Sequence, residues 1–300
     1  MKKIAAGAGR KLALSNLEKD LYPAYGFTKA AILDYYRRVA PFLLPHLKGR
    51  ALTLKRYPNG VDEAFFFEKR CPVYRPPWVA TAEIPRHGGE PLTACLVNDL
   101  PTLIWVGNLA SLELHVPLAG AAAPGTPDAV VFDLDPGEPA TILDCARVAL
   151  ILRDLFSKLS IEGYVKTSGQ KGLHVLVPLN RKGTTFEETK RFSKAVAEVL
   201  QQGYPDLATA KMAKAARIGK VFINWSQNDP SKTMVAVYSL RARAKPFVSF
   251  PLSWEELEAL SGRDNPEKFQ VLAGEALARI EKEGDRFREV LIKRQKLPYL

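Results

Sequence analysis

The sequence predicts an α+β fold with mixed or antiparallel sheets flanked by helices. Strand-like segments rich in β-branched and aromatic residues are interspersed with amphipathic helical segments, and two of the strand-like segments are close enough to form a hairpin. An Ala-, Gly- and Pro-rich stretch at 118–127 predicts a linker. We therefore expect a flexible basic N-terminus at 1–13, an N-terminal α/β module at 14–120 and a core at 121–300, the last two forming one compact unit.

Each expected element follows from its local pattern. Thr28 is a good N-cap for a helix over 29–39, and Pro41 and Pro45 are expected to end it. The pattern then predicts a strand at 51–57, a helix at 99–110 and a short strand at 113–116. In the core it predicts a strand at 129–136, a helix at 141–159, strands at 164–166 and 173–178, a helix at 186–201, a hairpin of 221–225 with 234–238, and helices at 254–260 and 266–290.

The charge balance of the chain is unusual for a soluble protein. Its 300 residues include 43 Lys and Arg against 32 Asp and Glu, a formal net charge of +11. Such an excess favours a polyanionic partner, nucleic acid above all, although it also serves solubility in general. The hydrophobic content of 47% supplies ample material for a core.

The cysteines and the chain start bear on the cellular compartment. Cys71, Cys95 and Cys145 are odd in number and form no Cys-x-x-Cys pair, so neither a disulfide framework nor a structural zinc site is expected. A reducing cytosol is the simplest setting for such usage. The basic start lacks the apolar stretch of a signal peptide, and no run is long enough to span a bilayer. We expect a cytoplasmic protein.

The strand at 129–136 carries the first chemical signal. It runs through apolar residues into Asp133 and Asp135, and Pro136 and Gly137 stop it. Residues two apart in a strand point to the same face, so the two carboxylates repel each other unless a cation lies between them. Mg²⁺ and Mn²⁺ prefer such oxygen ligands. The alternative is a strand end whose acids are simply solvated.

Two further segments suggest binding of phosphate and of bases. The turn Ser168-Gly-Gln-Lys-Gly-Leu-His174 combines glycines, which let the backbone approach a phosphate, with a hydroxyl, a lysine and a histidine. The aromatic run 65–67 precedes Glu68-Lys-Arg70, and alternating strand faces would leave at least one ring exposed to stack on a base. Packing of all three rings in the core is the alternative.

Together these strings resemble a known family. Asp133-Leu-Asp135 and the 168–174 turn look like motifs I and II of the archaeo-eukaryotic primase superfamily. The fuller strings Val-Phe-Asp-Leu-Asp-Pro-Gly, Thr-Ser-Gly-x-Lys-Gly-Leu-His, Trp-Ser-Gln-Asn and Tyr-Ser-Leu-Arg-Ala-Arg resemble the polymerase domain of bacterial ligase D and its stand-alone archaeal relatives. The resemblance runs from about Leu14 to about Glu256. We find no ligase or nuclease signature and expect the polymerase alone, with a primase-polymerase core.

The resemblance implies a template-directed nucleotidyltransferase of non-homologous end joining. It implies extension of a 3′-hydroxyl, filling of short gaps, a preference for ribonucleotides, and Mn²⁺ or Mg²⁺ as cofactor. The implied partners are DNA with a gap or 3′ overhang and a 5′-phosphate, nucleoside triphosphates, and a Ku-like protein with a separate DNA ligase. A cytoplasmic, nucleoid-associated location would follow.

The family's functional residues carry over onto matching positions of this chain. The implied metal ligands are Asp133 and Asp135. The implied triphosphate ligands are Ser168, Lys171, His174, Arg217, Arg241 and Arg243, and His115 would line the nucleotide pocket. The implied DNA contacts are Lys19 and Lys29 on the 5′-phosphate, Phe66 and Phe67 beside the template, and Lys55. For any one of these cations, a solvated surface charge is the ordinary alternative.

One position departs from the family pattern. Where the family places a third catalytic aspartate before Trp-Ser-Gln-Asn, this chain has Asn224. An asparagine keeps the size and one carbonyl oxygen but lacks the negative charge. In two-metal phosphoryl transfer that carboxylate mainly serves the ion that activates the attacking hydroxyl. We therefore expect a chain that binds nucleotide and DNA but extends primers poorly or not at all.

Two other functions compete with a polymerase. A haloacid-dehalogenase-type phosphatase also begins with an apolar strand and Asp-x-Asp, but it usually has Thr or Val where this chain has Pro136, and the motif usually lies near the domain start. A non-catalytic module that binds DNA ends is the stronger alternative, because Asn224 affects only the chemistry.

Overall fold

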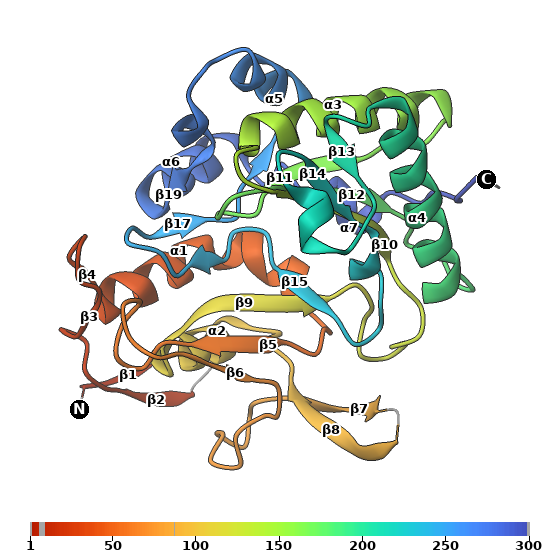
Figure 1. Cartoon of the computed structure of the whole chain (residues 1–300). Helices are drawn as coiled ribbons and strands as arrows, with labels where there is room; N and C mark the ends of the chain where they lie inside the picture. Colours follow the sequence, from red (N-terminus) through yellow and green to blue (C-terminus); the bar gives the residue numbers. More distant parts are fainter. Residues whose placement is uncertain (1, 6–9, 87, 299–300) are drawn as a thin grey trace. The chain divides into compact units, whose positions relative to one another are not determined.

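The computed structural model describes residues 2–5, 10–86 and 88–298 and confirms the α+β class (Figure 1). The chain forms two compact units, each assembled from several segments. Unit 1 contains Met1–Pro124, Thr233–Val248 and Leu272–Asp285, and unit 2 contains Gly125–Lys232, Ser249–Val271 and Arg286–Leu300. The first crossing, at Pro124, lies within the expected linker. The later returns of the chain to unit 1 differ from the expected continuous core at 121–300.

Unit 1 is built on a four-stranded sheet backed by two helices. The strand order is β15 (Thr233–Val235), β9 (Ser111–Pro117), β5 (Thr53–Arg56) and β6 (Phe66–Glu68), with every neighbouring pair antiparallel. The helices are α1 (Lys29–Leu47) and α2 (Leu100–Asn108), capped by Thr28 and Asp99. A side chain at Gly107 would meet Leu33 and Tyr36 at 2.9 Å, so this glycine permits their close packing.

Helix α1 continues through both of its prolines, and the prediction that they end it was wrong. Pro41 and Pro45 lie one turn apart on the exposed side of the helix. A proline inside a helix leaves a carbonyl one turn earlier without its N–H partner. On the exposed side water can reach that carbonyl, while Val39, Leu43 and Leu47 keep the buried face packed.

Three hairpins of unit 1 were not predicted. Strand β1 (Lys2–Ala5) pairs with β2 (Lys11–Leu14), so these parts of the N-terminus expected to be flexible are strands, and residues 1 and 6–9 lie outside the described residues. Strand β3 (Asp20–Tyr22) pairs with β4 (Phe27–Thr28). Strand β7 (Thr81–Arg86) pairs with β8 (Gly89–Cys95). In β2 the alternation of exposed Lys11 with buried Leu12 and Leu14 is the signal that was overlooked.

A disulfide joins Cys71 to Cys95, with 4.9 Å between their Cα atoms, and corrects the expectation that the cysteines are unpaired. The pairing was hidden in the sequence because the β7–β8 hairpin folds residue 95 back beside residue 71, where the Cys71 N–H donates to the carbonyl of Thr93. Cys145 is buried and free.

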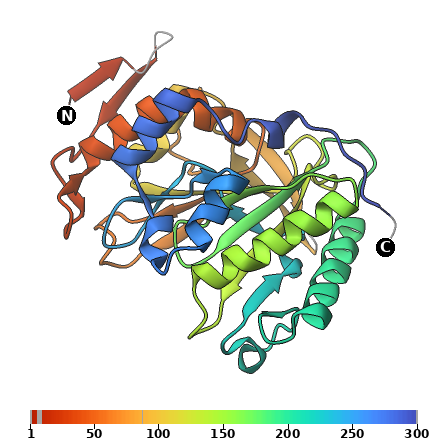
Figure 2. The ribbon, with the colours of Figure 1, turned by 90° about the horizontal axis from the view of Figure 1, so that it is seen from above.

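Unit 2 contains a six-stranded mixed sheet. Its order is β13 (Ala208–Thr209), β14 (Val221–Asn224), β10 (Ala129–Pro136), β12 (Leu173–Pro178), β11 (Tyr164–Thr167) and β18 (Pro251–Leu252), antiparallel except for the β13–β14 pair. Helices α3 (Ile142–Lys158) and α4 (Phe186–Gly203) lie side by side over the sheet (Figure 2). Both begin with a Thr capping box.

The two faces of the central strand β10 have different roles. Val130, Phe132 and Leu134 belong to the hydrophobic core formed with α3 and α4, and the Phe132 ring lies 5.3 Å from Phe156 and 6.4 Å from Phe192. Because side chains alternate along a strand, Asp133 and Asp135 point away from this core. The helices therefore hold the strand rigidly while the opposite face stays available for chemistry.

The predicted hairpin of 221–225 with 234–238 was wrong. Strand β14 pairs with β10 and β13 in unit 2, whereas β15 pairs with β9 in unit 1. The two strands were each predicted, but their partners lie far away in the sequence. The polar turn between them carries the short helix η2 (Trp225–Gln227).

The C-terminal third also contains more breaks than expected. In place of one helix over 266–290 the structure has η3 (Pro266–Phe269), β19 (Val271–Leu272), α6 (Ala273–Glu283) and α7 (Glu289–Ile292). Gly284, with φ of +75°, ends α6 in a conformation that continues no helix. The remaining elements are η1 (Lys214–Arg217), β16 (Leu240–Arg241), β17 (Phe247–Val248) and α5 (Trp254–Ser261). Among the described residues, no helix is long and apolar enough to cross a membrane.

Candidate functional site

A row of four polar residues crosses the sheet of unit 2. Asn224 on β14 lies opposite Asp133 on β10, Asp133 opposite His174 on β12, and His174 opposite Lys166 on β11. Directly opposed residues of antiparallel strands point to the same face, so pairing register alone brings these four side chains together. The strands' hydrogen-bonded ladders therefore fix the site's geometry.

Asp133 accepts hydrogen bonds from both neighbours in the row. Asn224 Nδ2 lies 3.1 Å from Asp133 Oδ2, and His174 Nε2 lies 3.2 Å from Asp133 Oδ1. On the outer side, Asn224 Oδ1 accepts from Ser226 Oγ at 2.7 Å, and Ser226 Oγ accepts from Lys232 Nζ at 2.8 Å. The Asn224 amide thus donates a hydrogen bond to the Asp133 carboxylate, whereas an aspartate at position 224 would repel it.

The two aspartates of β10 differ in their electrostatics. Burial alone raises the pKa of Asp133, but the hydrogen bonds from His174 and Asn224 outweigh it and lower that pKa below its usual value. Loss of hydration and the Asp133 charge raise the pKa of Asp135 to about 7, opposed by the charge of Arg217. One carboxylate is satisfied by the protein, and the other lacks a positive partner strong enough to offset its neighbour.

This donor set fits a divalent cation with hard oxygen ligands. Asp133 and Asp135 share one face of β10, and the pKa of Asp135 is raised first by loss of hydration and then by repulsion from Asp133, both of which a bound cation would offset. In the described part of the chain no group of three His, Cys, Asp or Glu residues has the geometry of a metal site, and the residue opposite Asp133 on β14 is Asn224. Two carboxylates are typical of Mg²⁺ sites completed by water and substrate phosphates. The residues that would hold the ion are Asp133 and Asp135, and it would supply Lewis-acid chemistry at a phosphate.

The 168–174 turn is organised around Ser168. Its Oγ accepts from the N–H groups of Gln170 and Gly172, both at 3.2 Å, and its N–H donates to the Gly172 carbonyl at 2.9 Å. A Cβ on Gly172 would lie 2.0 Å from the carbonyl oxygen of Leu134, so this glycine is required for the turn to pack on the metal-site strand. Gly169, with φ of +70°, supplies the left-handed residue of the turn. Lys171 Nζ pairs with exposed Glu138 at 2.9 Å.

Arg217 is the one of the three predicted triphosphate arginines that belongs to unit 2. Its guanidinium lies 3.7 Å over the ring of Phe222, and its charge acts on Asp135. A Cβ on Gly137 would lie 2.0 Å from the Arg217 carbonyl oxygen. The glycine that follows β10 therefore lets the backbone at Arg217 pack directly against the end of this strand. The structure thus brings together Asp133, Asp135, Ser168, Lys171, His174, Arg217 and Asn224 within unit 2.

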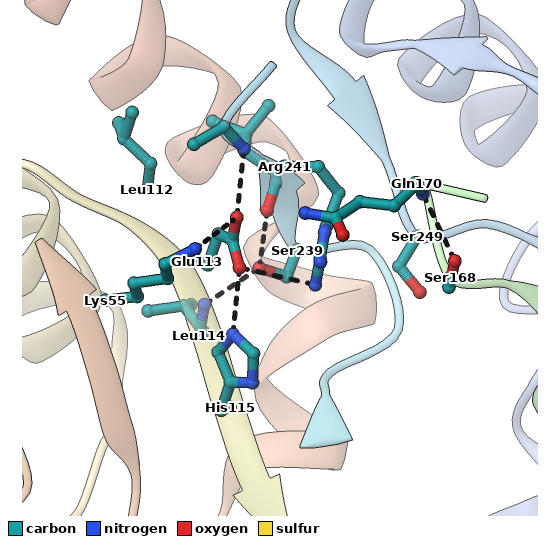
Figure 3. A network of polar contacts seen from close by, with 12 residues as sticks. Lys55, Leu112, Glu113, Leu114, His115, Ser168, Gln170, Ser239, Arg241 and Ser249 are labelled. Atoms are coloured by element: carbon teal, nitrogen blue, oxygen red, sulfur yellow. Dashed lines mark hydrogen bonds and ion pairs between the residues drawn. The ribbon is translucent and has the colours of Figure 1, made fainter. Parts of the chain in front are cut away.

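Unit 1 contains a second charged centre, formed around Glu113 on β9 (Figure 3). The side chain is 1% exposed. One carboxylate oxygen accepts from His115 Nε2 at 2.9 Å and pairs with Arg241 at 3.3 Å. The other accepts from the Ala242 N–H at 3.1 Å and pairs with Lys55 at 3.6 Å. Three of the predicted binding residues therefore converge on a glutamate that was not predicted.

The Glu113 centre is fully compensated. Burial alone raises the pKa of Glu113, but the His115 hydrogen bond and the neighbouring cations outweigh it and lower that pKa to about 2. Burial lowers the pKa of His115, with Arg241 and Lys55 acting in the same direction. A carboxylate only accepts, so the neutral His115 ring donates its Nε2–H and its tautomer is fixed.

The aromatic run is exposed, with Phe65 directly before the edge strand β6 and Phe66 and Phe67 on it. Phe65, Phe66 and Phe67 are 48%, 44% and 55% exposed. The alternative that all three rings pack in the core is therefore wrong, and all three are exposed where at least one was expected to be. Lys55 Nζ lies 4.0 Å from the centre of the Phe65 ring, and Arg56 lies 5.0 Å from that of Phe66. Exposed rings beside cations suit the stacking of bases.

Lys19 and Lys29 lie near each other in unit 1. Lys19 Nζ donates to Asn59 at 2.8 Å, and Lys29 Nζ to Ser15 at 3.4 Å. Burial, together with the charges of Lys19 and Arg56, lowers the pKa of Lys29 to about 8. Adjacent ammonium groups with neutral partners favour an anion between them. Arg243, the remaining predicted arginine, lies 5.3 Å over the ring of Phe247.

The described fold and site define a class of protein: a nucleotidyltransferase of the primase-polymerase type. Family comparison agrees, because residues 28–287 match the model of the LigD primase-polymerase domain, and the chain belongs to that family. The polymerase domain of Mycobacterium tuberculosis ligase D, solved in complex with DNA, superimposes with a TM-score of 0.87 at 39% identity, covering 95% of this chain and 99% of that one.

Curated relatives are longer proteins of end joining. The chain is 40% identical over 290 residues to the multifunctional non-homologous end joining DNA repair protein LigD of Mycobacterium tuberculosis, and 32% identical over 249 residues to the bifunctional LigD of Bacillus subtilis. These alignments cover 94% and 83% of this chain but 37% and 40% of the relatives. These matches are all to LigD proteins, so the haloacid-dehalogenase-type alternative receives no support from them.

Proposed function

We propose that this chain is a template-directed polymerase that extends a 3′-hydroxyl and fills short gaps at DNA breaks during end joining. The observation that carries the proposal is the acidic pair of β10, held in register with Asn224 and His174 and adjacent to the Ser168 turn. One carboxylate of the pair is satisfied and the other repelled, which is an arrangement suited to a divalent cation and the phosphates it binds.

The finer features follow the family resemblance. The polymerase prefers ribonucleotides and uses Mn²⁺, with Mg²⁺ as the alternative ion. Its DNA substrate carries a 5′-phosphate and either a gap or a 3′ overhang. The Lys19 and Lys29 ammonium groups bind the 5′-phosphate, and Phe66 and Phe67 stack on the template. Exposed aromatic rings and adjacent cations support these contacts. A Ku-like protein and a separate DNA ligase act with it in a cytoplasmic, nucleoid-associated setting.

Asn224 limits the rate of this polymerase. Its amide nitrogen donates to Asp133 and its oxygen accepts from Ser226. Position 224 therefore has no negative charge to help bind the cation that activates the attacking hydroxyl. Turning the amide by 180° would direct Oδ1 toward Asp133, and Ser226 Oγ can accept from the displaced Nδ2. The site therefore accommodates a cation with asparagine present, but it holds the attacking hydroxyl's ion weakly.

Primer extension on gapped DNA with a 5′-phosphate tests both statements. Ribonucleotides and deoxynucleotides are compared in Mn²⁺ and in Mg²⁺ for the chain, for Asn224→Asp, and for Asn224→Asp with Asp133→Asn. We expect weak incorporation by the chain, a gain in Asn224→Asp of about 100-fold, equivalent to roughly 3 kcal/mol of barrier, and loss of activity in the double variant. Tight DNA binding without incorporation in Asn224→Asp would instead favour a non-catalytic module that binds DNA ends.

A further inference from the structure

Lys166 is a fully buried lysine at the inner end of the polar row. It lies on β11, its relative exposure is 0%, and it has no place among the residues implied by the family resemblance. Its Nζ lies 2.9 Å from His174 Nδ1 and 2.7 Å from Ser249 Oγ. Burying an ammonium is costly unless its hydrogen-bonding groups are satisfied, so a lysine retained here needs a reason.

The contacts of Lys166 assign the hydrogen atoms of the row. An ammonium group only donates, so His174 Nδ1 accepts from it and the ring proton sits on Nε2. Nε2 lies 3.2 Å from Asp133 Oδ1, which as a carboxylate only accepts. Ser249 Oγ accepts another hydrogen bond from Lys166 Nζ and donates one to the Thr167 carbonyl at 2.7 Å. The hydrogen bonds from Lys166 through His174 therefore all point toward Asp133.

The other side of the row has the same polarity. Lys232 donates to Ser226, Ser226 donates to Asn224, and Asn224 donates to Asp133. Asp133 is thus the single acceptor between two chains of donors, each of which begins at a lysine. Its two oxygens are held by groups from the two neighbouring strands, which fixes the plane of the carboxylate.

We propose that Lys166 is a positioning residue for the acidic centre. By donating to Nδ1 it holds His174 in the Nε2–H tautomer, and this tautomer fixes the orientation of the Asp133 carboxylate. The consequence for cation binding rests on the proposed function, whereas the tautomer does not. A merely structural lysine would contribute to stability and leave the proton on His174 and the geometry of Asp133 unaffected.

The tautomer is measured directly by ¹⁵N NMR of the imidazole rings in the metal-free protein. The chain has four histidines, and the spectrum of His174→Gln identifies the His174 signals. We expect His174 to carry a proton on Nε2 with Nδ1 as the acceptor, and Lys166→Met, which keeps the volume but removes the donor, to shift at least a third of the rings to the Nδ1–H tautomer. Protonation at Nδ1 in the unmodified chain, or an unchanged ring in Lys166→Met, overturns the proposal.

Mn²⁺ affinity tests the effect on Asp133. Loss of a residue that orients a metal ligand costs 10–100-fold in metal affinity, and we expect Lys166→Met to bind Mn²⁺ about 10-fold or more weakly. Val165→Ala is the matched control, since Val165 is a buried core residue of the same strand. It should lower the melting temperature and leave both the His174 tautomer and the Mn²⁺ affinity unchanged. Equal Mn²⁺ affinity of Lys166→Met and the unmodified chain contradicts the proposal.

A second variant protects the experiment against a folding failure. Ser249→Ala removes an acceptor of Lys166, together with the hydrogen bond from Ser249 to the Thr167 carbonyl, and leaves the lysine in place. We expect it to shift the His174 ring and the Mn²⁺ affinity in the same direction as Lys166→Met but less, and no shift in either quantity counts against the proposal. If the unmodified chain binds no Mn²⁺ and incorporates no nucleotide, the proposed function fails, while the ¹⁵N result still decides the role of Lys166.

Discussion

Burial disfavours the charged form of two carboxylates in this molecule, Glu113 and Asp135, but their neighbours shift the two pKa values in opposite directions. Glu113 of unit 1 is enclosed by His115, Lys55 and Arg241, and its pKa falls to about 2. Asp135 of unit 2 loses hydration and lies beside the Asp133 charge, and together these raise its pKa to about 7. The first is compensated within the protein and stabilises the fold. The second lacks enough positive charge nearby to stabilise its ionised form, as is typical of a carboxylate that binds a cation.

Removing the Glu113 charge should therefore have the largest effect on stability. Glu113→Gln leaves Lys55 and Arg241 without their buried counter-charge, and breaking such a pair costs about 3–5 kcal/mol. We expect a fall of this size in the free energy of unfolding of unit 1, measured by urea denaturation. Arg37→Gln, which breaks an exposed pair with Asp34, is the control and should change it by less than about 1 kcal/mol. Equal effects in the two variants would contradict the contrast.

The pH dependence of the same group sharpens the comparison. Glu113 has its pKa lowered from 4.5 to about 2 on folding, so its charge stabilises the folded state above pH 4.5. This contribution, about 3 kcal/mol for a shift of this size, is lost as the pH falls from 4.5 through 2. Urea denaturation of the unmodified chain and of Glu113→Gln between pH 2 and pH 7 should give curves that converge at the acid end. A constant difference would exclude this origin.

The uncompensated cations of unit 1 should affect binding more than folding. Lys19 and Lys29 have neutral partners, and their proximity lowers the pKa of Lys29 to about 8. We expect Lys19→Ala with Lys29→Ala to weaken binding of gapped DNA with a 5′-phosphate by roughly 10-fold more than binding of the same DNA without it, about 1.4 kcal/mol of lost preference. Fluorescence anisotropy measures both affinities. Equal losses on the two DNAs would refute the assigned role.

The sequence predicted the part of the site that depends on local pattern. Apolar runs ending in Asp133 and a glycine turn ending in His174 identify strands and their ends, and the fold class followed from them. Asn224 was located because it occupies a motif position, and β-register then placed it opposite Asp133. Local periodicity and turn chemistry decide such features without knowledge of distant partners.

The sequence could not predict contacts made across long separations. Lys166 reads as an ordinary polar position of a short strand, and only its pairing with β12 places it against His174. Glu113 precedes His115 by two residues in a strand, a weak sign that they share a face, but Arg241 reaches it from a distant segment. The Cys71–Cys95 disulfide and the β15–β9 pairing depend in the same way on tertiary structure.

The smallest expected effect tests the deficit at Asp135 itself. Asp135→Asn removes one of two like charges, and a carboxylate whose pKa is raised destabilises the folded state as the pH rises from 3.8 through 7. Although Asp135 loses part of its hydration, enough of the residue stays exposed that solvent screening limits the gain to about 1 kcal/mol. We expect Asp135→Asn to unfold at slightly higher urea concentration than the unmodified chain at pH 8 in EDTA. In Mn²⁺ the order should reverse, because only the unmodified chain retains both carboxylates for the ion. A loss of stability in EDTA as large as that of Glu113→Gln would show that Asp135 is compensated by the fold after all.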